Sequence, residues 1–166
     1  MSGAAVIGAG SWGTALAIHL ARNGTDTTLW ARRPEAARAL QQERCNAEHL
    51  PGCPFPDRLV VTGDLEEALR GRGLVLLVTP AQWSRPIVRQ AAAFVDAAAD
   101  VLIASKGIEE QSGLRLTEVL RQEAPASPLG RAGVLSGPSF ALEVARGDPT
   151  AIVSASRDHT AMGRVQ

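Results

Sequence analysis

Short apolar runs alternate with longer amphipathic stretches along the chain, and glycine or proline residues separate them. Short runs rich in β-branched residues are typical of strands, whereas apolar positions three or four residues apart are typical of helices. Strands are therefore expected at 4–7, 27–30, 59–62, 74–78, 101–104, 133–135 and 150–155. Helices are expected at 12–23, 34–43, 84–95, 114–121 and 139–146, with another beginning at Asp158. This order predicts an α/β fold, doubly wound around a mostly parallel sheet.

Breaking and capping residues define some of these boundaries. Gly24 is suited to end the first helix, and Pro34 is suited to the first turn of the second. Asp64, with a glutamate three residues later, has the spacing of a capping box and predicts a short helix. The segment 44–57 contains three prolines and a glycine and is expected to be a loop. The alanine-rich run 91–99 is expected to be helical, and no internal repeat divides the chain.

Composition narrows the class of protein. The 166 residues fit one domain, and their 17 basic and 17 acidic side chains balance, whereas nucleic-acid-binding domains are usually strongly basic. Two cysteines make no disulfide framework, and no signal peptide is expected, because no charged-then-apolar pattern opens the sequence. No apolar run approaches the roughly 18 residues of a membrane span. We therefore expect a cytoplasmic protein with no membrane span and no nucleic-acid partner. Cys45, His49 and Cys53 have metal-ligand spacing, but Pro51 and Gly52 interrupt them, so no metal site is expected.

A glycine motif follows the first predicted strand and opens the first predicted helix: Gly8-Ala9-Gly10-Ser11-Trp12-Gly13. In a unit of this kind the first glycine allows a tight turn, the second lets the backbone approach a pyrophosphate, and the third lets helix and strand pack closely. The motif thus predicts a Rossmann-type domain that binds NAD or NADP. The alternative is a glycine-rich connection without a ligand, in which Trp12 only anchors the core.

The second predicted strand ends in Ala31-Arg32-Arg33, where an NAD-specific domain usually carries an acidic residue. Two guanidinium groups can pair with a 2′-phosphate through charge-assisted hydrogen bonds, so NADP(H) is expected to be accepted. The alternative is a solvated turn at the entrance of the next helix.

Lys106 stands out because the other sixteen basic residues are arginine. It follows a predicted strand, and the carboxyl ends of parallel strands are where such sheets bind ligands. Its compact ammonium could hydrogen-bond a carbonyl or hydroxyl at a reacting carbon. The alternative is an ordinary surface lysine.

Together, five segments resemble bacterial NAD(P)-dependent glycerol-3-phosphate dehydrogenase: Gly8 to Ala17, Leu29 to Arg32, Asn46 with Leu50-Pro51, Ser105-Lys106-Gly107, and Ser136 to Ala141 with Glu143. The resemblance implies hydride transfer between the nicotinamide and dihydroxyacetone phosphate, which gives sn-glycerol 3-phosphate for phospholipid synthesis.

Residue by residue, the resemblance implies two sets of contacts. Those to the cofactor are Ser11, Trp12, Arg32, Arg33, Lys106 and Ala141. Those to the substrate are Lys106, Gly137 and Ser139, so Lys106 belongs to both sets. Trp83 is expected to flank the nicotinamide side.

Members of this family continue into a helical second domain, which carries the lysine that donates and accepts the proton, the groups that hold the substrate phosphate, and much of the dimer interface. Residues 1–166 are therefore expected to be the N-terminal cofactor-binding domain of an enzyme that is a homodimer at full length. The isolated chain is expected to bind cofactor and turn over little. The alternatives are the cofactor domain of a ketopantoate-type reductase or a non-catalytic nucleotide-sensing module.

Overall fold

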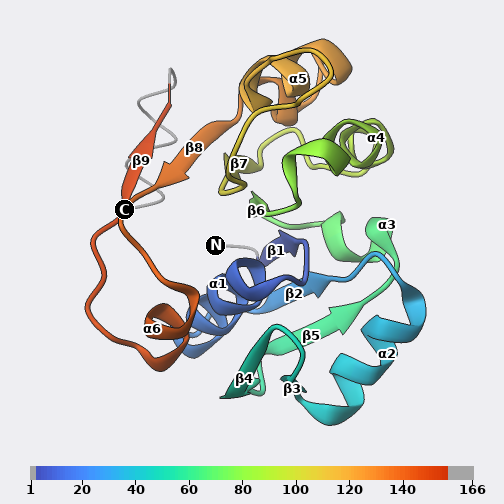
Figure 1. Ribbon diagram of the computed structural model, residues 1–166. Helices are drawn as coiled ribbons and strands as arrows, with labels where there is room; N and C mark the ends of the chain where they lie inside the picture. The colour runs from blue at the N-terminus through green and yellow to red at the C-terminus, as the bar shows by residue number, and fades with distance from the viewer. Residues whose placement is uncertain (1–2, 157–166) are drawn as a thin grey trace.

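The computed structural model describes residues 3–156, which fold around one seven-stranded sheet (Figure 1). Its spatial order is β5-β2-β1-β6-β7-β8-β9, and each neighbouring pair is parallel except β8 and β9. The chain winds outward from β1 on one side and then returns to build the other half from β6. The predicted doubly wound, mostly parallel, Rossmann-type fold is therefore confirmed. The strands are β1 (Ala4–Ile7), β2 (Thr27–Trp30), β5 (Leu59–Thr62), β6 (Leu74–Leu77), β7 (Asp100–Ile103), β8 (Gly133–Ser136) and β9 (Val153–Ala155).

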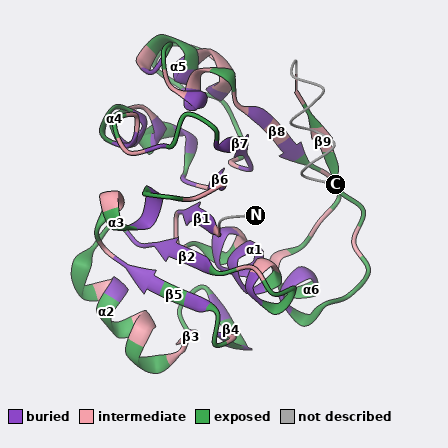
Figure 2. Ribbon diagram, turned by 180° about the vertical axis from the view of Figure 1, so that it is seen from behind, coloured by how far each residue is buried: buried purple, intermediate pink, exposed green. Residues whose placement is uncertain are grey.

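Helices cover both faces of this sheet, and two hydrophobic clusters fill the layers between. The helices are α1 (Ser11–Arg22), α2 (Pro34–Glu43), α3 (Leu65–Leu69), α4 (Ala81–Ala91), α5 (Leu116–Glu123) and α6 (Ala141–Arg146), with a 3-10 turn at Pro128–Arg131. Strand β1 shows the division, because Val6 packs in the cluster of α1 and α6 whereas Ile7 packs in that of α3, α4 and α5. The central strands are thus buried on both faces (Figure 2), which leaves their carboxyl ends as the place for a site.

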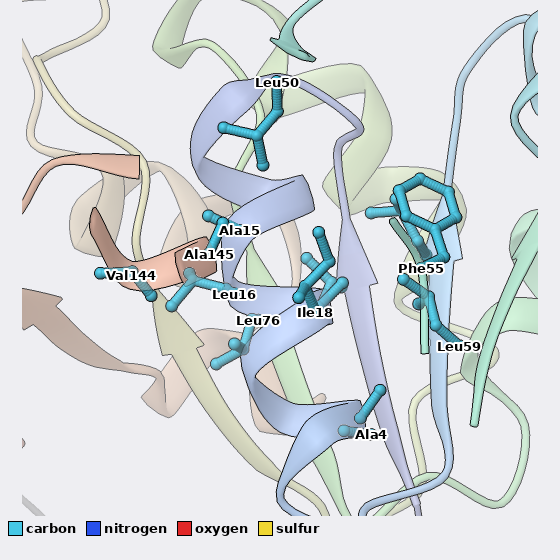
Figure 3. Close-up of a cluster of buried hydrophobic side chains, with 14 of the residues drawn as sticks. Ala4, Ala15, Leu16, Ile18, Leu50, Phe55, Leu59, Leu76, Val144 and Ala145 are labelled. Carbon is cyan, nitrogen blue, oxygen red and sulfur yellow. The ribbon is translucent and has the colours of Figure 1, made fainter. Parts of the chain in front are cut away.

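The predicted loop at 44–57 is wrong, because the structure forms a hairpin there from β3 (Cys45–Asn46) and β4 (Leu50–Pro54). Arg44 ends α2 in the left-handed conformation, with φ of 52°. Its guanidinium then donates to the carbonyls of Leu59 and Pro56, each at 2.7 Å. Leu50 and Phe55 pack into the α1 cluster (Figure 3). Contacts distant in sequence therefore override the breaking residues of the segment.

The β5 edge of the sheet is closed by side chains of this region. Alongside the Arg44 bond to the Leu59 carbonyl, the Val61 N–H donates to Gln41 Oε1 at 2.7 Å. The outward-facing Leu59 carbonyl and Val61 N–H are thereby satisfied without a neighbouring strand.

Several predicted helix boundaries also move. The alanine-rich run is not helical beyond Ala91. Residues 92–99 form turns, and Val95 and Ala99 are buried in the same cluster as Val101 and Ile103 of β7, so tertiary packing overrides helix propensity. Helix α4 begins at Ala81 instead of 84, and α6 begins at Ala141 instead of 139.

The capping box at Asp64 is half formed. Its carboxylate accepts from the N–H groups of Glu66 and Glu67, but the Glu67 carboxylate accepts from the Thr62 hydroxyl at 2.5 Å. Gly24 takes the predicted left-handed position after α1, with φ of 87°. The helix expected at Asp158 lies outside the described residues. Within 3–156, no helix is both long and apolar enough to cross a membrane.

Candidate functional site

A cleft of about 790 Å³ opens at the carboxyl ends of β1, β2, β6 and β7. Five segments that are distant in sequence line it: the glycine turn 8–13, the end of β2 at 30–33 with Ala36, Ala39, Leu40 and Glu43 of α2, the hairpin tip 46–49, residues 78–80 with Trp83 and Ile87 of α4, and the loop 104–106 after β7. Nine of the residues singled out from the sequence line this one cleft: Gly8, Gly10, Ser11, Trp12, Gly13, Arg32, Arg33, Trp83 and Lys106.

The three motif glycines meet different surroundings. Gly8 has φ of 124°, and a Cβ on Gly13 would lie 1.9 Å from the Gly8 carbonyl oxygen. The fold itself therefore requires these two glycines, for the turn and for close helix packing. A Cβ on Gly10 would have no atom of the described chain within 4 Å. Protein packing does not account for Gly10, which leaves its backbone open to a ligand in the cleft.

Helix α1 begins at Ser11, directly behind this open glycine. Its N-cap residue is Gly10, which supplies no side-chain cap among the described residues. The N–H groups of the first turn, at the positive end of the helix dipole, are therefore available to an anion. The Ser11 hydroxyl is not available in this arrangement, because it donates to the His49 carbonyl at 2.6 Å.

Asn46 ties the hairpin to the glycine turn, a role that sequence reasoning did not assign to it. Its amide Nδ2 donates to the Ala9 carbonyl at 3.0 Å and to Thr14 Oγ1 at 2.8 Å. Its Oδ1 accepts from the His49 N–H at 3.2 Å, and the residue is 2% exposed. No periodicity marks such an asparagine, because Ala9 and Thr14, to which its amide donates, are more than 30 residues away.

Arg32 and Trp83 meet across the cleft. The Arg32 guanidinium lies 5.0 Å from the centroid of the Trp83 ring, within range of a cation–π contact. Neither Arg32 nor the adjacent Arg33 forms an ion pair within residues 3–156. Two guanidinium groups without a carboxylate partner in the described chain therefore stand at the end of β2.

Lys106 is exposed and follows β7. It therefore lies on the opposite side of the cleft from Arg32 and Arg33, which follow β2. The preceding residue, Ser105, donates from both its N–H and its hydroxyl to the Leu77 carbonyl, each at 3.1 Å. The Lys106 ammonium has no hydrogen bond or ion pair in the described part of the chain.

Gly137, Ser139 and Ala141 do not line the cleft. They follow β8, where the Ser139 N–H donates to the Gly137 carbonyl at 3.0 Å and Ala141 packs against the α1 cluster. Gly137 has φ of 147°, and a Cβ there would lie 2.6 Å from the Ala151 carbonyl oxygen. The approach of the chain before β9 therefore accounts for this glycine without a ligand.

Beneath the Lys106 loop, Arg85 makes a bidentate pair with Glu109, at 2.8 and 2.6 Å, and a second pair with Glu123. The hydrogen bonds from Arg85, and then from Ser112, lower the pKa of Glu109 from 4.5 to about 2. The charged carboxylate is thus the form that the fold favours, and it holds the loop against α4 and α5.

The lowered pKa gives a testable pH dependence. Since native Glu109 binds its proton less readily than the unfolded chain does, its contribution to stability is complete above pH 4.5 and is lost as the pH falls toward 2. We expect Glu109→Gln to lower the melting temperature at pH 7 and to bring it closer to the wild-type value with each step from pH 4.5 toward 2. Thermal melts monitored by circular dichroism measure this. Glu110→Gln, at the exposed neighbouring carboxylate, should follow wild type, and a constant difference between Glu109→Gln and wild type would contradict the assignment.

Cys45 lies on β3 and Cys53 lies on β4 of the hairpin. No group of three or more His, Cys, Asp or Glu side chains in the described chain could hold a metal ion.

Comparison with known proteins agrees with this geometry. Residues 3–162 match the family described as NAD-dependent glycerol-3-phosphate dehydrogenase N-terminus. The chain is 48% identical over 152 residues to the NAD(P)+ glycerol-3-phosphate dehydrogenase of Thioalkalivibrio sulfidiphilus, covering 92% of this chain and 45% of that protein. A protein of the same name from Rhodospirillum rubrum is 48% identical over 154 residues, covering 93% and 43%.

A crystal structure of glycerol-3-phosphate dehydrogenase from Coxiella burnetii superposes with a TM-score of 0.89 at 35% identity, covering 99% of this chain and 49% of that one. The chain thus spans less than half the length of these relatives. The resemblance expected from the motifs is confirmed, and the chain belongs to the family of N-terminal domains of NAD-dependent glycerol-3-phosphate dehydrogenases.

Proposed function

We propose that this domain binds NADP(H) or NAD(H) in the cleft, with the diphosphate at the N-terminus of α1. The observation that carries the proposal is the open backbone of Gly10 ahead of an uncapped helix, since packing accounts for Gly8 and Gly13 but not for Gly10. Free N–H groups at the positive end of a helix suit an anion of this kind. The cleft volume of about 790 Å³ is within the range that small-molecule and cofactor sites occupy.

The adenosine 2′-phosphate of NADP(H) would lie at Arg32 and Arg33. Trp83 contacts Arg32, so we assign its ring to this adenosine end of the cleft. This assignment differs from the nicotinamide side expected for Trp83 from the sequence, and the two stay alternative proposals.

The nicotinamide would lie toward Lys106, and the bound cofactor supplies the hydride of the reaction. The unpaired ammonium of Lys106 is suited to hydrogen-bond the substrate carbonyl oxygen. It can thereby stabilise the negative charge that develops there as the hydride arrives. Gly137, Ser139 and Ala141 stand at the same edge of the sheet, two strands beyond β6, and remain predicted contacts.

We further propose that the complete enzyme reduces dihydroxyacetone phosphate to sn-glycerol 3-phosphate for phospholipid synthesis. Relatives at 48% identity carry the name glycerol-3-phosphate dehydrogenase. This reaction also needs an acid to protonate the alkoxide and a site for the substrate phosphate. We assign both to the rest of the enzyme, together with a homodimer interface. A cytoplasmic location, a small-molecule substrate and low turnover by the isolated chain stay predictions.

The arginine assignment predicts a cofactor-specific effect. Arg32→Ala should raise the Kd for NADPH about tenfold to 100-fold, because one charge-assisted hydrogen bond contributes about 1.5–3 kcal/mol. The Kd for NADH, which lacks the 2′-phosphate, should change by less than about twofold. Titration of nicotinamide fluorescence measures both constants.

Arg38→Ala is the matched control, because Arg38 is an exposed arginine on α2 that does not line the cleft. An equal loss for NADPH and NADH in Arg32→Ala would remove the 2′-phosphate from this position. A ratio of the two constants near one in both proteins would do the same.

A further inference from the structure

Lys106 sits on a loop that is held from the far side, away from the cleft. Within residues 3–156 its ammonium has no partner of its own, and its side chain is exposed. A four-carbon side chain without a partner can sample many rotamers, so the position of its charge depends on how firmly the backbone beneath it is held.

Gln82 supplies one part of that hold. Its Nε2 donates to the Ile108 carbonyl at 3.0 Å, and its Oε1 accepts from the Glu110 N–H at 2.9 Å. One side-chain amide therefore pairs with two backbone groups of the loop, in the way that a neighbouring strand would. The bracketed residues begin two positions after Lys106.

Gln82 does not act through the core or through the cleft surface. Its side chain is exposed and does not line the cleft, although its neighbours Pro80 and Trp83 do. The helix that carries it is held separately, since Ile87 and Val88 are buried and Arg85 pairs with Glu109. Loss of the Gln82 amide should therefore loosen the loop without unfolding the domain.

We propose that Gln82 is a positioning residue, which holds Lys106 at the cleft by bracketing the backbone at Ile108 and Glu110. The inference rests on the proposed function, because only that function requires the Lys106 ammonium to be held at the cleft. It does not make Gln82 a contact of either cofactor or substrate.

The single lysine makes the test direct. Reductive methylation with ¹³C-formaldehyde labels two kinds of amine, the chain N-terminus and Lys106, so the ε-dimethyl NMR signal reports one residue. The test variant is Gln82→Met, which keeps the length of the side chain and removes both hydrogen-bonding groups. The matched control is Gln90→Met, at an exposed glutamine of the same helix without a side-chain hydrogen bond in the described chain.

In the ligand-free Gln82→Met protein, the Lys106 signal should narrow and shift toward that of a free dimethyl-lysine. The Glu110 amide should exchange with solvent about fivefold faster or more, since it loses its acceptor. The Kd for NADPH should rise about threefold to tenfold while the melting temperature stays within about 3 °C of wild type. Gln90→Met should match wild type in all of these.

A Lys106 signal unchanged in Gln82→Met, despite faster exchange of the Glu110 amide, would overturn the proposal, because the bracket would then be broken without any effect on the lysine. A large fall in melting temperature with no change in the Lys106 signal would overturn it as well, and Gln82→Ala repeats both measurements. Failure of the proposed function would give a different result. The Lys106 signal of the wild-type protein and the nicotinamide fluorescence would then not respond to NADPH. The comparison of ligand-free Gln82→Met with ligand-free wild type would still test the effect of Gln82 on Lys106.

Discussion

Gly13→Ala should destabilise the domain by about 3 kcal/mol or more, which is the upper range for an overpacked site. The added Cβ would lie 1.9 Å from the Gly8 carbonyl oxygen and 3.1 Å from its carbon. Movement of Gly8 is restricted, because its N–H donates to the Trp30 carbonyl at 3.1 Å and the Val78 carbonyl oxygen lies 2.7 Å from where a Cβ on Gly8 would stand. Urea unfolding followed by circular dichroism gives the change in free energy.

Gly10→Ala is the control for that measurement, since its Cβ would meet no atom of the described chain within 4 Å. It should cost no more than about 1 kcal/mol, the usual effect of alanine at an N-cap. An unfolding midpoint for Gly13→Ala equal to that of wild type would contradict the packing of α1 against the glycine turn.

Gly10→Val should have the opposite profile: a large loss of cofactor affinity with little loss of stability. The valine side chain would occupy the space from which the diphosphate reaches the first N–H groups of α1. Loss of two hydrogen bonds to a charged group, each worth about 1.5 kcal/mol, corresponds to about a 100-fold rise in the Kd for NADPH. The melting temperature should fall by no more than about 4 °C.

Fluorescence titration and thermal melts of the same Gly10→Val preparation provide both values, and Gly10→Ala should give an intermediate Kd. Wild-type affinity in Gly10→Val would show that the diphosphate does not lie over Gly10. A parallel loss of affinity and stability would show that the glycine serves the fold instead.

Local patterns were sufficient for most of the sheet and for the centre of the site. The four-residue strand at Ala4–Ile7 and the glycines at 8, 10 and 13 are close in sequence, so periodicity and spacing identify them together. Lys106 could be found because a nearly lysine-free composition makes one lysine after a predicted strand conspicuous. These signals can be identified without knowing the tertiary contacts.

The remainder depends on contacts between distant residues. The hairpin at 45–54 forms although it contains prolines, because Arg44 reaches the Leu59 and Pro56 carbonyls and Leu50 enters the core. Asn46 acquires its partners only when that hairpin lies on the glycine turn. The contact of Trp83 with Arg32 joins the start of α4 to the end of β2, so no local pattern predicts it.

The closed β5 edge limits how two copies of this domain can associate. An edge strand with free backbone groups is a template for pairing with another chain and can lead to aggregation. In β5 the Leu59 carbonyl and the Val61 N–H are already occupied by Arg44 and Gln41. At high protein concentration, growth of the sheet by addition of a strand beside β5 is therefore disfavoured, even though Val60 on that strand is 45% exposed.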